Sequence, residues 1–286
     1  MCSAMKTVLV TGASTGIGEA CALHLDRLGH RVYAGVRKED DAERLAGQGS
    51  PRLIPVFLDV TDQAQIDAVA KQIADDGDGG LDGLVNNAGV ARGGPLEYLP
   101  IDEWREQLEV NVIGQVAVTR TVLPLIRAAK GRIVFIGSIG GKVATMMMGP
   151  YNASKFAIEG IGDSLRQELQ PWGIGVSVVE PGAIKTPIWA KGRETADRLE
   201  RDLPEAARTL YAGHMAGIRK GIEMQDRQGI GPEKVAAVVE QALFSAKPKA
   251  RYPVGKDAKV MSAMVRLLPD RAREAIVRKV AGPARP

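Results

Sequence analysis

The residues of this sequence best suited to move a proton are Tyr151 and Lys155, which lie four positions apart. The residues after Tyr151 predict a helix, and positions four apart on a helix share one face. A neighbouring ammonium favours the phenolate form of a tyrosine, which makes Tyr151 a candidate acid or base at working pH. Taken alone, the same spacing is more typical of an ordinary pair on a helix surface.

A second hydroxyl group is expected near Tyr151. Ser138 ends the strand-like run 132–137 and would present its side chain at the mouth of a sheet. If Ser138 and Tyr151 both touch one substrate oxygen, two donors act on that oxygen, which suits carbonyl chemistry. These residues therefore predict a site that reduces a carbonyl group or oxidises an alcohol.

A glycine-rich segment, TGASTGIG at 11–18, lies between a β-branched apolar run at 6–10 and a helical pattern that starts at Ala20. Strand, glycine turn and helix in this order are typical of a phosphate-binding turn. Gly12 would permit the tight turn, Gly16 would let the backbone approach a pyrophosphate, and Gly18 would allow close packing. A plain glycine-rich connector is the alternative, and the flanking strand and helix argue against it.

The charge after the second expected strand, 31–36, indicates which dinucleotide binds. An acidic residue at that place would suit a free ribose 2′-hydroxyl, but Arg37 and Lys38 stand there instead. A basic residue suits a 2′-phosphate, so NADP(H) is favoured and NAD(H) is kept as the alternative. Both residues could also be solvated turn charges beside the acidic run 39–41.

Strand patterns and helix patterns alternate along the chain. Further strands are expected at 53–58, 81–85, 132–137, 175–179 and 251–254, with long helical stretches at 103–129 and 233–244. This alternation predicts an α/β fold with a doubly wound parallel sheet of about seven strands and helices on both faces. Ligands of such sheets bind beyond the carboxyl ends of the strands, where all the motifs above lie. We expect one domain over 1–286, with the helix-compatible run 189–228 as a lid over the crevice.

Asn111 lies in the middle of the helical stretch 103–129, among apolar residues. A buried asparagine needs a hydrogen-bond partner. Catalysis and a local structural hydrogen bond are the two interpretations of this residue.

The composition describes an ordinary globular protein with room for a large core: 286 residues, 45% hydrophobic and 25% charged. Cys2 and Cys21 form no CxxC motif, and His24, His30 and His214 are scattered, so we expect neither a disulfide framework nor a metal site. No secretory signal and no run of membrane-spanning length is expected. These features favour a cytoplasmic protein.

The C-terminal tail, 256–286, is expected to be helical and is basic. From Lys247 onward there are eleven Lys and Arg residues against three Asp and Glu residues. Its apolar stripes could make weak contact with an anionic membrane surface, or could dock onto the body of the protein or a partner subunit. No basic, aromatic patch typical of nucleic-acid binding is present.

Taken together, the motifs make the sequence resemble the classical short-chain dehydrogenase/reductase family over nearly the whole chain. The elements that carry the resemblance, in the family's order and spacing, are TGASTGIG, Asn86-Asn87-Ala88-Gly89, Asn111, Ser138, Tyr151-Asn152-Ala153-Ser154-Lys155 and Pro181-Gly182. The longer segments GRIVFIGSIGGKVA, GPYNASKFAIEGIGDSLRQEL and GVSVVEPGAIKTPI resemble most the branch that contains 17β-hydroxysteroid and retinol dehydrogenases. The resemblance implies a single-domain Rossmann fold.

The resemblance also implies a role for each site residue. Tyr151 would be the acid/base, Ser138 would orient and polarise the substrate oxygen, Lys155 would lower the pKa of Tyr151 and hold the nicotinamide ribose, and Asn111 would support a proton relay. The implied cofactor contacts are Gly12, Ser14, Ile17 and Gly18 at the pyrophosphate, Arg37 at the adenosine phosphate, Asp59 and Val60 at adenine, Asn87 and Gly89 at the adenosine ribose, and Pro181, Gly182, Ile184 and Thr186 near the nicotinamide. The glycine motif has Ser14-Thr15 beside its second glycine where a basic residue would support NADP(H), so that prediction depends on Arg37 alone.

The predicted function is therefore an NADP(H)-dependent oxidoreductase that moves a hydride between nicotinamide and a carbonyl or secondary alcohol. The adaptable apolar segment 144–149 favours a bulky apolar substrate such as a steroid, retinoid or lipid ketone, although its methionines could instead pack in the core. Members of the family commonly form dimers or tetramers, so a homo-oligomer is expected. The alternative function is a cofactor-binding sensor or interaction module with little turnover, against which the four catalytic positions weigh.

Overall fold

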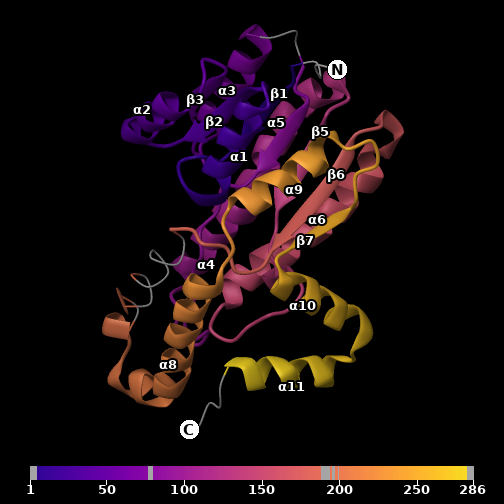
Figure 1. The fold of residues 1–286 in the computed structure, drawn as a ribbon. Helices are drawn as coiled ribbons and strands as arrows, with labels where there is room; N and C mark the ends of the chain where they lie inside the picture. Colours follow the sequence, from indigo (N-terminus) through magenta and orange to yellow (C-terminus); the bar gives the residue numbers. More distant parts are fainter. Residues whose placement is uncertain (1–4, 77–79, 188–193, 195–196, 199, 282–286) are drawn as a thin grey trace.

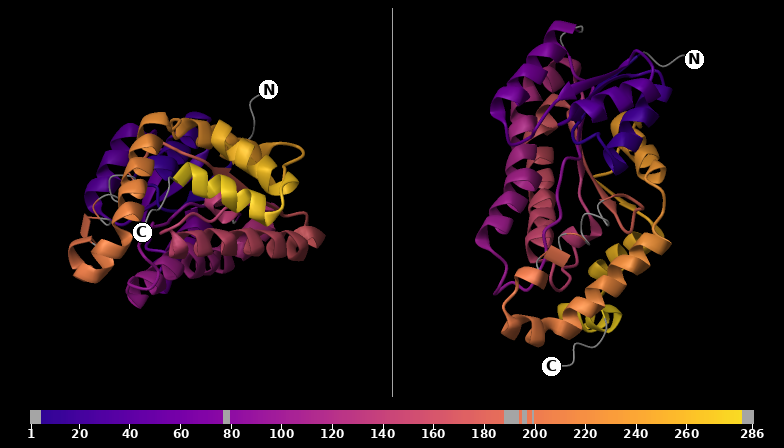
Figure 2. Two further views of the ribbon diagram at one scale, coloured as in Figure 1. Left: turned by 90° about the horizontal axis from the view of Figure 1, so that it is seen from below. Right: turned by 90° about the vertical axis from the view of Figure 1, so that its left-hand side faces the viewer.

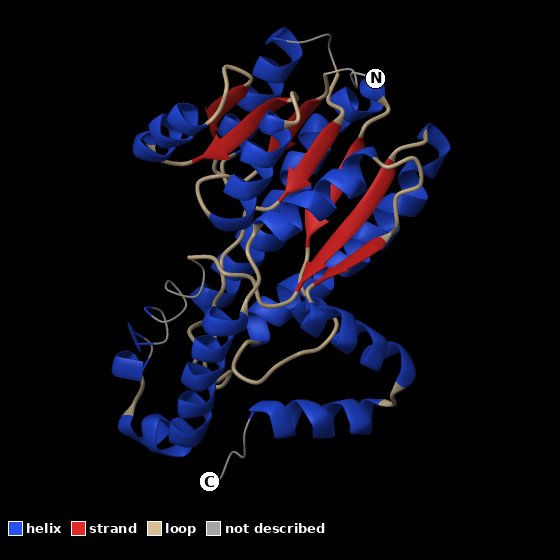
Figure 3. Cartoon of the chain, viewed as in Figure 1, coloured by secondary structure: helices blue, strands red, loops and turns tan. Residues whose placement is uncertain are grey.

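The computed structural model describes residues 5–76, 80–187, 194, 197–198, 200–281 of the chain. In these residues seven parallel strands form one sheet, in the order β3-β2-β1-β4-β5-β6-β7 (Figures 1 and 3). The strands are β1 Thr7–Val10, β2 Arg31–Val36, β3 Leu53–Phe57, β4 Gly83–Asn86, β5 Arg132–Ile136, β6 Gly175–Pro181 and β7 Arg251–Val254. The predicted doubly wound parallel sheet is confirmed.

Helices cover both faces of the sheet. The helices are α1 Gly16–Arg27, α2 Glu39–Gln48, α3 Gln63–Asp76, α5 Gly114–Ala129, α6 Gly149–Leu169 and α9 Glu233–Phe244. Val8 and Val10 of β1 pack in the core with residues of α1 and α9, whereas Leu9 packs in the core that includes α3 and α5. Because successive side chains of a strand point to opposite faces, a parallel strand covered on both faces is apolar throughout.

The other helices lie beyond the carboxyl ends of the strands. These are α4 Ile101–Leu108, α8 Glu205–Gln228, α10 Lys256–Leu267 and α11 Asp270–Ala281. Figure 1 shows α8, α10 and α11 below the sheet, and both views in Figure 2 show α11 running across the same end near α8. Elements that follow β6 therefore form most of the surroundings of the crevice at that end.

Parts of two predicted segments can be compared with the structure. Within the predicted lid, 189–193, 195–196 and 199 lie outside the described residues, as do 282–286 of the tail. In the tail, α10 is docked on the body through Ala258 and Ser262, which are buried, while Val260 and Leu267 are exposed. The tail thus combines a docked face with an exposed apolar face.

The predicted helical stretch at 103–129 is confirmed, but its α-helical pattern changes in the middle. Between α4 and α5 the chain makes a π-helical turn, Glu109–Ile113, around Asn111. A π-helical turn inserts one residue into the regular pattern of hydrogen bonds and is often found at functional sites. Here it contains Asn111, which is fully buried.

The expectation that no run reaches membrane-spanning length is wrong for one helix. By length and composition alone, Ile101–Ala129 could cross a membrane, which is weak evidence because the core helix of a soluble protein can pass the same test. Val118, Val122 and Ile126 of this helix are fully buried in the core beneath the sheet. Packing in the core therefore accounts for the buried part of this helix, which is 33% of its most apolar window.

Candidate active site

The glycine turn after β1 is built by backbone atoms in close contact. Gly12 and Gly16 have φ values of 63° and 64°, in the left-handed region that favours glycine. A Cβ atom at Gly12 would lie 2.7 Å from the Ala88 Cα atom, and one at Gly18 would overlap the carbonyl of Gly12. The turn can therefore form only with glycine at these places.

Residues that follow β4 hold this turn in place. The Asn87 side-chain amide donates hydrogen bonds to the carbonyl oxygens of Thr11 and Gly12, each at 2.9 Å. The Thr11 hydroxyl accepts from the backbone N–H groups of Asn87 and Ala88, each at 3.0 Å. The resemblance implied that Asn87 lies at the adenosine ribose. In the structure its side-chain amide instead donates both of its hydrogen bonds to the glycine turn.

The turn fits the pyrophosphate of a dinucleotide. Helix α1 begins directly in it, and the N-cap residue Thr15 makes no side-chain capping hydrogen bond. Uncapped N–H groups at a helix start, beside glycines that leave room, attract and hold phosphate oxygens. Ser14 and Ile17 are partly buried in the same turn, so the residues implied for the pyrophosphate lie together.

The residues implied for the adenosine end also lie together. The Arg37 side chain is 67% exposed, and its guanidinium lies 3.6 Å from the carboxylate of Asp59. Burial acts to raise the pKa of Asp59, but hydrogen bonds from Thr61 and the charge of Arg37 outweigh it, so the pKa is lowered. Val60 is buried beside Asp59. An exposed cation beyond the end of β2 is thus available to an anionic group.

Arg44 on α2 is a residue of this region that sequence reasoning missed. Its guanidinium donates to the carbonyl oxygen of Ser14 in the glycine turn and pairs with Glu19 on α1. Asp41 lies one turn earlier on the helix and 3.6 Å away from the same group. The available signal was an Asp–Arg pair three positions apart on the helix that follows Arg37.

Ser138 lies just beyond β5, as predicted, in extended backbone. It caps the short 3₁₀ helix η2, Ile139–Gly141, and its hydroxyl accepts a hydrogen bond from the N–H of Gly140 at 3.0 Å. The same hydroxyl lies close enough to the phenol of Tyr151 to lower its pKa, and both side chains border Gly140. The Asn152 amide donates to the Gly140 carbonyl at 2.9 Å, which ties η2 to α6. The two predicted hydroxyl groups therefore meet.

Tyr151 and Lys155 lie on one face of α6, as the spacing predicted, with the ammonium 5.8 Å from the centre of the Tyr151 ring. Lys155 is 6% exposed, and its ammonium donates to the carbonyl of Ile136 at 2.8 Å. The lowering of the Tyr151 pKa by Lys155 that the resemblance implies stays a prediction, and the net shift is upward. Burial raises the pKa of Tyr151, with only the Ser138 hydrogen bond opposing, and burial lowers the pKa of Lys155 to about 8. The ammonium bonds a backbone oxygen rather than the phenol.

Asn111 makes structural hydrogen bonds. Its side-chain oxygen accepts from the N–H of Val90 at 2.8 Å, and its amide donates to the Val90 carbonyl at 3.0 Å and to the Ser154 hydroxyl at 3.2 Å. Ser154 in turn donates to the carbonyl of Tyr151 at 2.7 Å. Gln107, also missed from the sequence, donates to the Val90 carbonyl at 2.9 Å. The side chain of Asn111 thus supports the backbone after Gly89, and its part in a proton relay stays a prediction.

The loop that follows β6 lies against the glycine turn. A Cβ atom at Gly16 would lie 3.1 Å from the Thr186 methyl carbon, so the two segments are in contact. Gly182 donates to the carbonyl of Val254 at 2.9 Å, and Ala183 donates to the carboxylate of Asp257 at 2.7 Å. Pro181 and Ile184 are buried in the same loop. Sequence reasoning missed Asp257, which lies in the first turn of α10.

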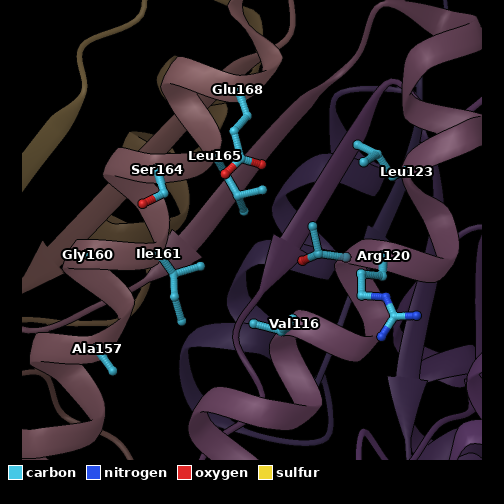
Figure 4. Close-up of a pocket in the computed structure, with 10 residues that line it drawn as sticks. Val116, Arg120, Leu123, Ala157, Gly160, Ile161, Ser164, Leu165 and Glu168 are labelled. Atoms are coloured by element: carbon cyan, nitrogen blue, oxygen red, sulfur yellow. The ribbon is translucent and has the colours of Figure 1, made fainter.

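One groove among the described residues lies away from this site. It has a volume of about 490 Å³ and runs between α5 and α6 (Figure 4). Val116, Leu123, Ile161 and Leu165 give it apolar walls, and Arg120 and Glu168 lie on opposite helices. None of the predicted catalytic residues lines it.

Comparisons with known proteins agree with this geometry. The family model described as short chain dehydrogenase matches residues 6–197. The chain is 36% identical over 281 residues to an NADPH-dependent 3-dehydrocapnine reductase from Ornithobacterium rhinotracheale, covering 96% of this chain and 97% of the relative. It is 37% identical to 17-beta-hydroxysteroid dehydrogenase type 6 from Bos taurus, covering 92% and 85% of the two chains. It is also 37% identical to retinol dehydrogenase 5 from Mus musculus, covering 94% and 87%.

Solved structures show the same fold. A short-chain dehydrogenase from Streptomyces avermitilis is 30% identical with a TM-score of 0.77, and 98% of each chain is covered. A short chain dehydrogenase from Burkholderia cenocepacia, in complex with NADP, is 26% identical with a TM-score of 0.73 and the same coverage. The chain therefore belongs to the classical short-chain dehydrogenase/reductase family, in the branch of the 17β-hydroxysteroid and retinol dehydrogenases, and is an NAD(P)-dependent oxidoreductase acting on an alcohol or ketone.

Proposed function

We propose that this chain transfers a hydride between NADP(H) and the carbonyl or secondary-alcohol carbon of a bulky apolar substrate. The observation that carries the proposal is that the Ser138 hydroxyl and the Tyr151 ring both border Gly140, at the carboxyl end of the sheet. Lys155 lies on the same face of the helix as Tyr151, and the glycine turn contacts the loop after β6 at the same end. The bound nicotinamide supplies the hydride, and the protein supplies orientation and the proton.

The protonation state of Tyr151 suits reduction. Because burial raises the pKa of this phenol, it is protonated at neutral pH and can donate to an oxygen that gains negative charge. Ser138 supplies a second donor to the same oxygen, which stabilises that charge. The nearby ammonium of Lys155 stabilises the phenolate that forms when the proton leaves.

Two observations support NADP(H) over NAD(H). The exposed guanidinium of Arg37 lies beyond the end of β2, where a carboxylate would instead suit a free ribose hydroxyl. The printed names of the Ornithobacterium relative and the Burkholderia structure, which mention NADPH and NADP, point the same way.

The wall beside Tyr151 supports an apolar substrate. Met146 and Met148 are partly buried just before α6, and Leu96 is 56% exposed. Leu96 contacts the start of α6, because a Cβ atom at Gly149 would overlap its side chain. The relatives' names mention 3-dehydrocapnine, hydroxysteroid and retinol, which supports a steroid, retinoid or lipid-like ketone or alcohol as the substrate.

We also propose that 189–228 acts as a lid. In the described part of this run, the Tyr211 hydroxyl donates to Glu97 at 2.7 Å and its ring meets Tyr98 edge-on at 6.1 Å. Arg198 pairs with Glu103 at 2.6 Å. These contacts hold the run against the loop that carries Leu96, where it can exclude water from a bound substrate.

The substitution Tyr151→Phe tests the proposed chemistry. Loss of the phenol hydroxyl should lower turnover by about 100-fold or more, while the dissociation constant for NADPH changes less than about twofold because no cofactor-binding turn is altered. NADPH oxidation is measured with retinal, a 17-ketosteroid, 3-dehydrocapnine and a long-chain aliphatic ketone, and is repeated with NADH. The control is Tyr33→Phe, which removes a phenol that bonds Asp76 far from the site.

Two results would contradict the proposal. Near-normal turnover by Tyr151→Phe would remove Tyr151 from the chemistry. NADPH binding with no oxidation of any ketone by the unaltered protein would favour a cofactor-bound sensor or interaction module.

The groove between α5 and α6 supports a homo-oligomer. Ile113 and Phe156, on the same two helical segments, are 53% and 46% exposed, which is unusual for large apolar side chains. We propose that a second copy of the chain covers this face. Sedimentation of Phe156→Glu should then show a shift to smaller species, and an unchanged mass would exclude this face.

We propose that the protein is cytoplasmic. The exposed face of α10 in the tail supports the further proposal that it makes weak contact with an anionic membrane surface. Val260 and Leu267 are 67% and 79% exposed on α10, and Lys256 and Lys259 are exposed on the same helix. Flotation with anionic vesicles should recover the protein and should recover less of Leu267→Glu. Equal recovery of both proteins would exclude contact through α10.

A further inference from the structure

A cluster of charged side chains, with the buried carboxylates of Glu159 and Glu180 at its centre, lies next to the segment that carries Ser138. Its members come from η2, α6, β6 and β7 and are Lys142, Glu159, Asp163, Arg166, Glu180 and Arg251. The Glu180 side chain is 1% exposed, and that of Lys142 is 18% exposed. None of these residues has a part in the hydride or proton transfer described above.

Two cations and two carboxylates form the centre of the cluster. The Lys142 ammonium lies 3.2 Å from the Glu180 carboxylate and 3.5 Å from that of Glu159. Arg251 lies 2.8 Å from Glu159 and 3.6 Å from Glu180. Each cation therefore bridges both carboxylates, and through them β6 and α6.

Removing the charges at the centre of the cluster from water costs free energy, which offsets much of the stability that their ion pairs provide. Burial and the nearby carboxylate of Glu159 raise the pKa of Glu180. Neither carboxylate oxygen of Glu180 has a hydrogen-bond partner of good geometry among the described residues. Buried ion pairs often contribute no more stability than apolar side chains of the same size, whereas removal of one partner is strongly destabilising. A role in positioning accounts for the cluster better than stability does.

Three segments that contain or adjoin members of the cluster also contribute to the candidate active site. Lys142 is the C-cap residue of η2, whose Gly140 N–H orients the Ser138 hydroxyl. Glu159 lies one helical turn beyond Lys155 on the same face of α6. Glu180 immediately precedes Pro181 and Gly182, in the loop that contacts the glycine turn.

We propose that Lys142 is a positioning residue: its ammonium, held by Glu180 and Glu159, anchors the end of η2, so that the Ser138 hydroxyl, which accepts from the Gly140 N–H, stays in place beside Tyr151. The inference depends on the proposed roles of Ser138 and Tyr151. Lys142 does not touch the substrate oxygen and acts through η2.

The test compares Lys142→Met, Lys142→Arg and Tyr151→Phe. Lys142→Met should lower kcat about tenfold to a hundredfold because a misplaced donor weakens orientation at the reacting oxygen. The KM for the ketone and the dissociation constant for NADPH should change less than about threefold, since their binding surfaces are intact. Lys142→Arg, which keeps a cation in reach of both carboxylates, should recover most of kcat.

A matched control removes an ion pair at the opposite end of the sheet. Lys6 pairs with Asp82 at 2.8 Å, before β1 and β4, with 40% and 22% of the side chains exposed. Lys6→Met should lower the thermal midpoint without changing kcat. If Lys142→Met fails to fold, Glu180→Gln, which keeps the side-chain shape and removes the charge, must show the same loss of kcat.

The outcomes separate two failures. If Tyr151→Phe is inactive and the folded Lys142→Met or Glu180→Gln variant has the kcat of Lys6→Met, the positioning role is wrong and the catalytic proposal stands. If Lys142→Arg is as slow as Lys142→Met, the ammonium does not act through its ion pairs and the inference is overturned. If Tyr151→Phe keeps its turnover, the proposed function itself fails.

Discussion

The glycine turn and the segment that carries Ser138 and Tyr151 lie at the same end of the sheet but are built differently. At the turn, backbone atoms are in such close contact that a Cβ atom at Gly12 would lie 2.7 Å from the Ala88 Cα atom, in the segment after β4. Around Tyr151 the walls are side chains such as Leu96, which contacts Gly149 at the start of α6 and is 56% exposed. The cofactor end is therefore defined by backbone shape and the substrate end by replaceable side chains.

This difference explains how one fold serves several substrates. Changes at the turn alter the path of the backbone and with it the fold. Helices α8 and α10 lie outside the sheet and its two core clusters, so changes on their exposed faces should leave the packing of the sheet intact. The following predictions test that contrast, from the largest expected effect to the smallest.

Gly18→Ala should have the largest effect. The new methyl group would overlap the Gly12 carbonyl and the Asn87 amide, and it should cost about 3 kcal/mol or more of stability and abolish NADPH binding. Urea unfolding and NADPH fluorescence measure the two effects. Gly47→Ala is the control: nothing lies within 4 Å of a Cβ atom there, near the end of α2. Equal tolerance of both variants would contradict a turn defined by backbone contact.

Arg37→Ala should affect only one cofactor. Loss of the exposed guanidinium should lower kcat/KM for NADPH by about 10- to 100-fold, since a charge-assisted hydrogen bond contributes about 1.5–3 kcal/mol. The value for NADH should change little, because NADH carries no 2′-phosphate. Lys38→Ala removes the neighbouring charge as a control. Equal losses with both cofactors would assign Arg37 a structural role with Asp59.

Lys155→Met should separate stability from activity. The pKa of Lys155 is lowered to about 8, whereas lysine in an unfolded chain titrates near about 10.4. The folded state therefore releases this proton more readily, and the penalty for burying the charge is complete below pH 8 and fades as the pH rises toward the unfolded value.

The variant should lose turnover and yet gain about 2 kcal/mol of stability at pH 7, after the lost hydrogen bond to Ile136 is subtracted. The gain over the unaltered protein should shrink by pH 10, as urea unfolding at both pH values would show. Lys259→Met, which removes an exposed lysine, is the control. A gain that stays constant from pH 7 to pH 10 would exclude titration of Lys155 as its cause.

Leu267→Gln should have the smallest effect. This side chain is 79% exposed, so the substitution should change the free energy of unfolding by no more than about 0.5 kcal/mol. The shift of the thermal midpoint measures this change. The comparison is Leu84→Ala, in a fully buried position of β4, which should cost about 2–5 kcal/mol. A large loss from Leu267→Gln would mean that the exposed face of α10 is covered in solution.

Some features of the molecule could be predicted from the sequence, and others could not. Strand β2, strand β7 and helix α9 begin and end where the apolar patterns predicted them, because local periodicity and boundary residues decide such elements. The π-helical turn at Asn111 was not predicted, since it depends on hydrogen bonds to Val90, which lies 21 residues away. The raised pKa of Tyr151 was also missed, because burial is a property of the packed structure.

The sequence by itself determined the parallel sheet, the glycine turn and the set of Ser138, Tyr151 and Lys155. Each of these features depends on residues that lie close together along the chain or on motifs that follow one another in a fixed order. Only the tertiary structure decided that Arg44 reaches the glycine turn, that Asp257 holds the loop after β6, and that Lys142 joins Glu159 and Glu180. Contacts between distant residues, and the loss of water around them, arise only when the elements pack.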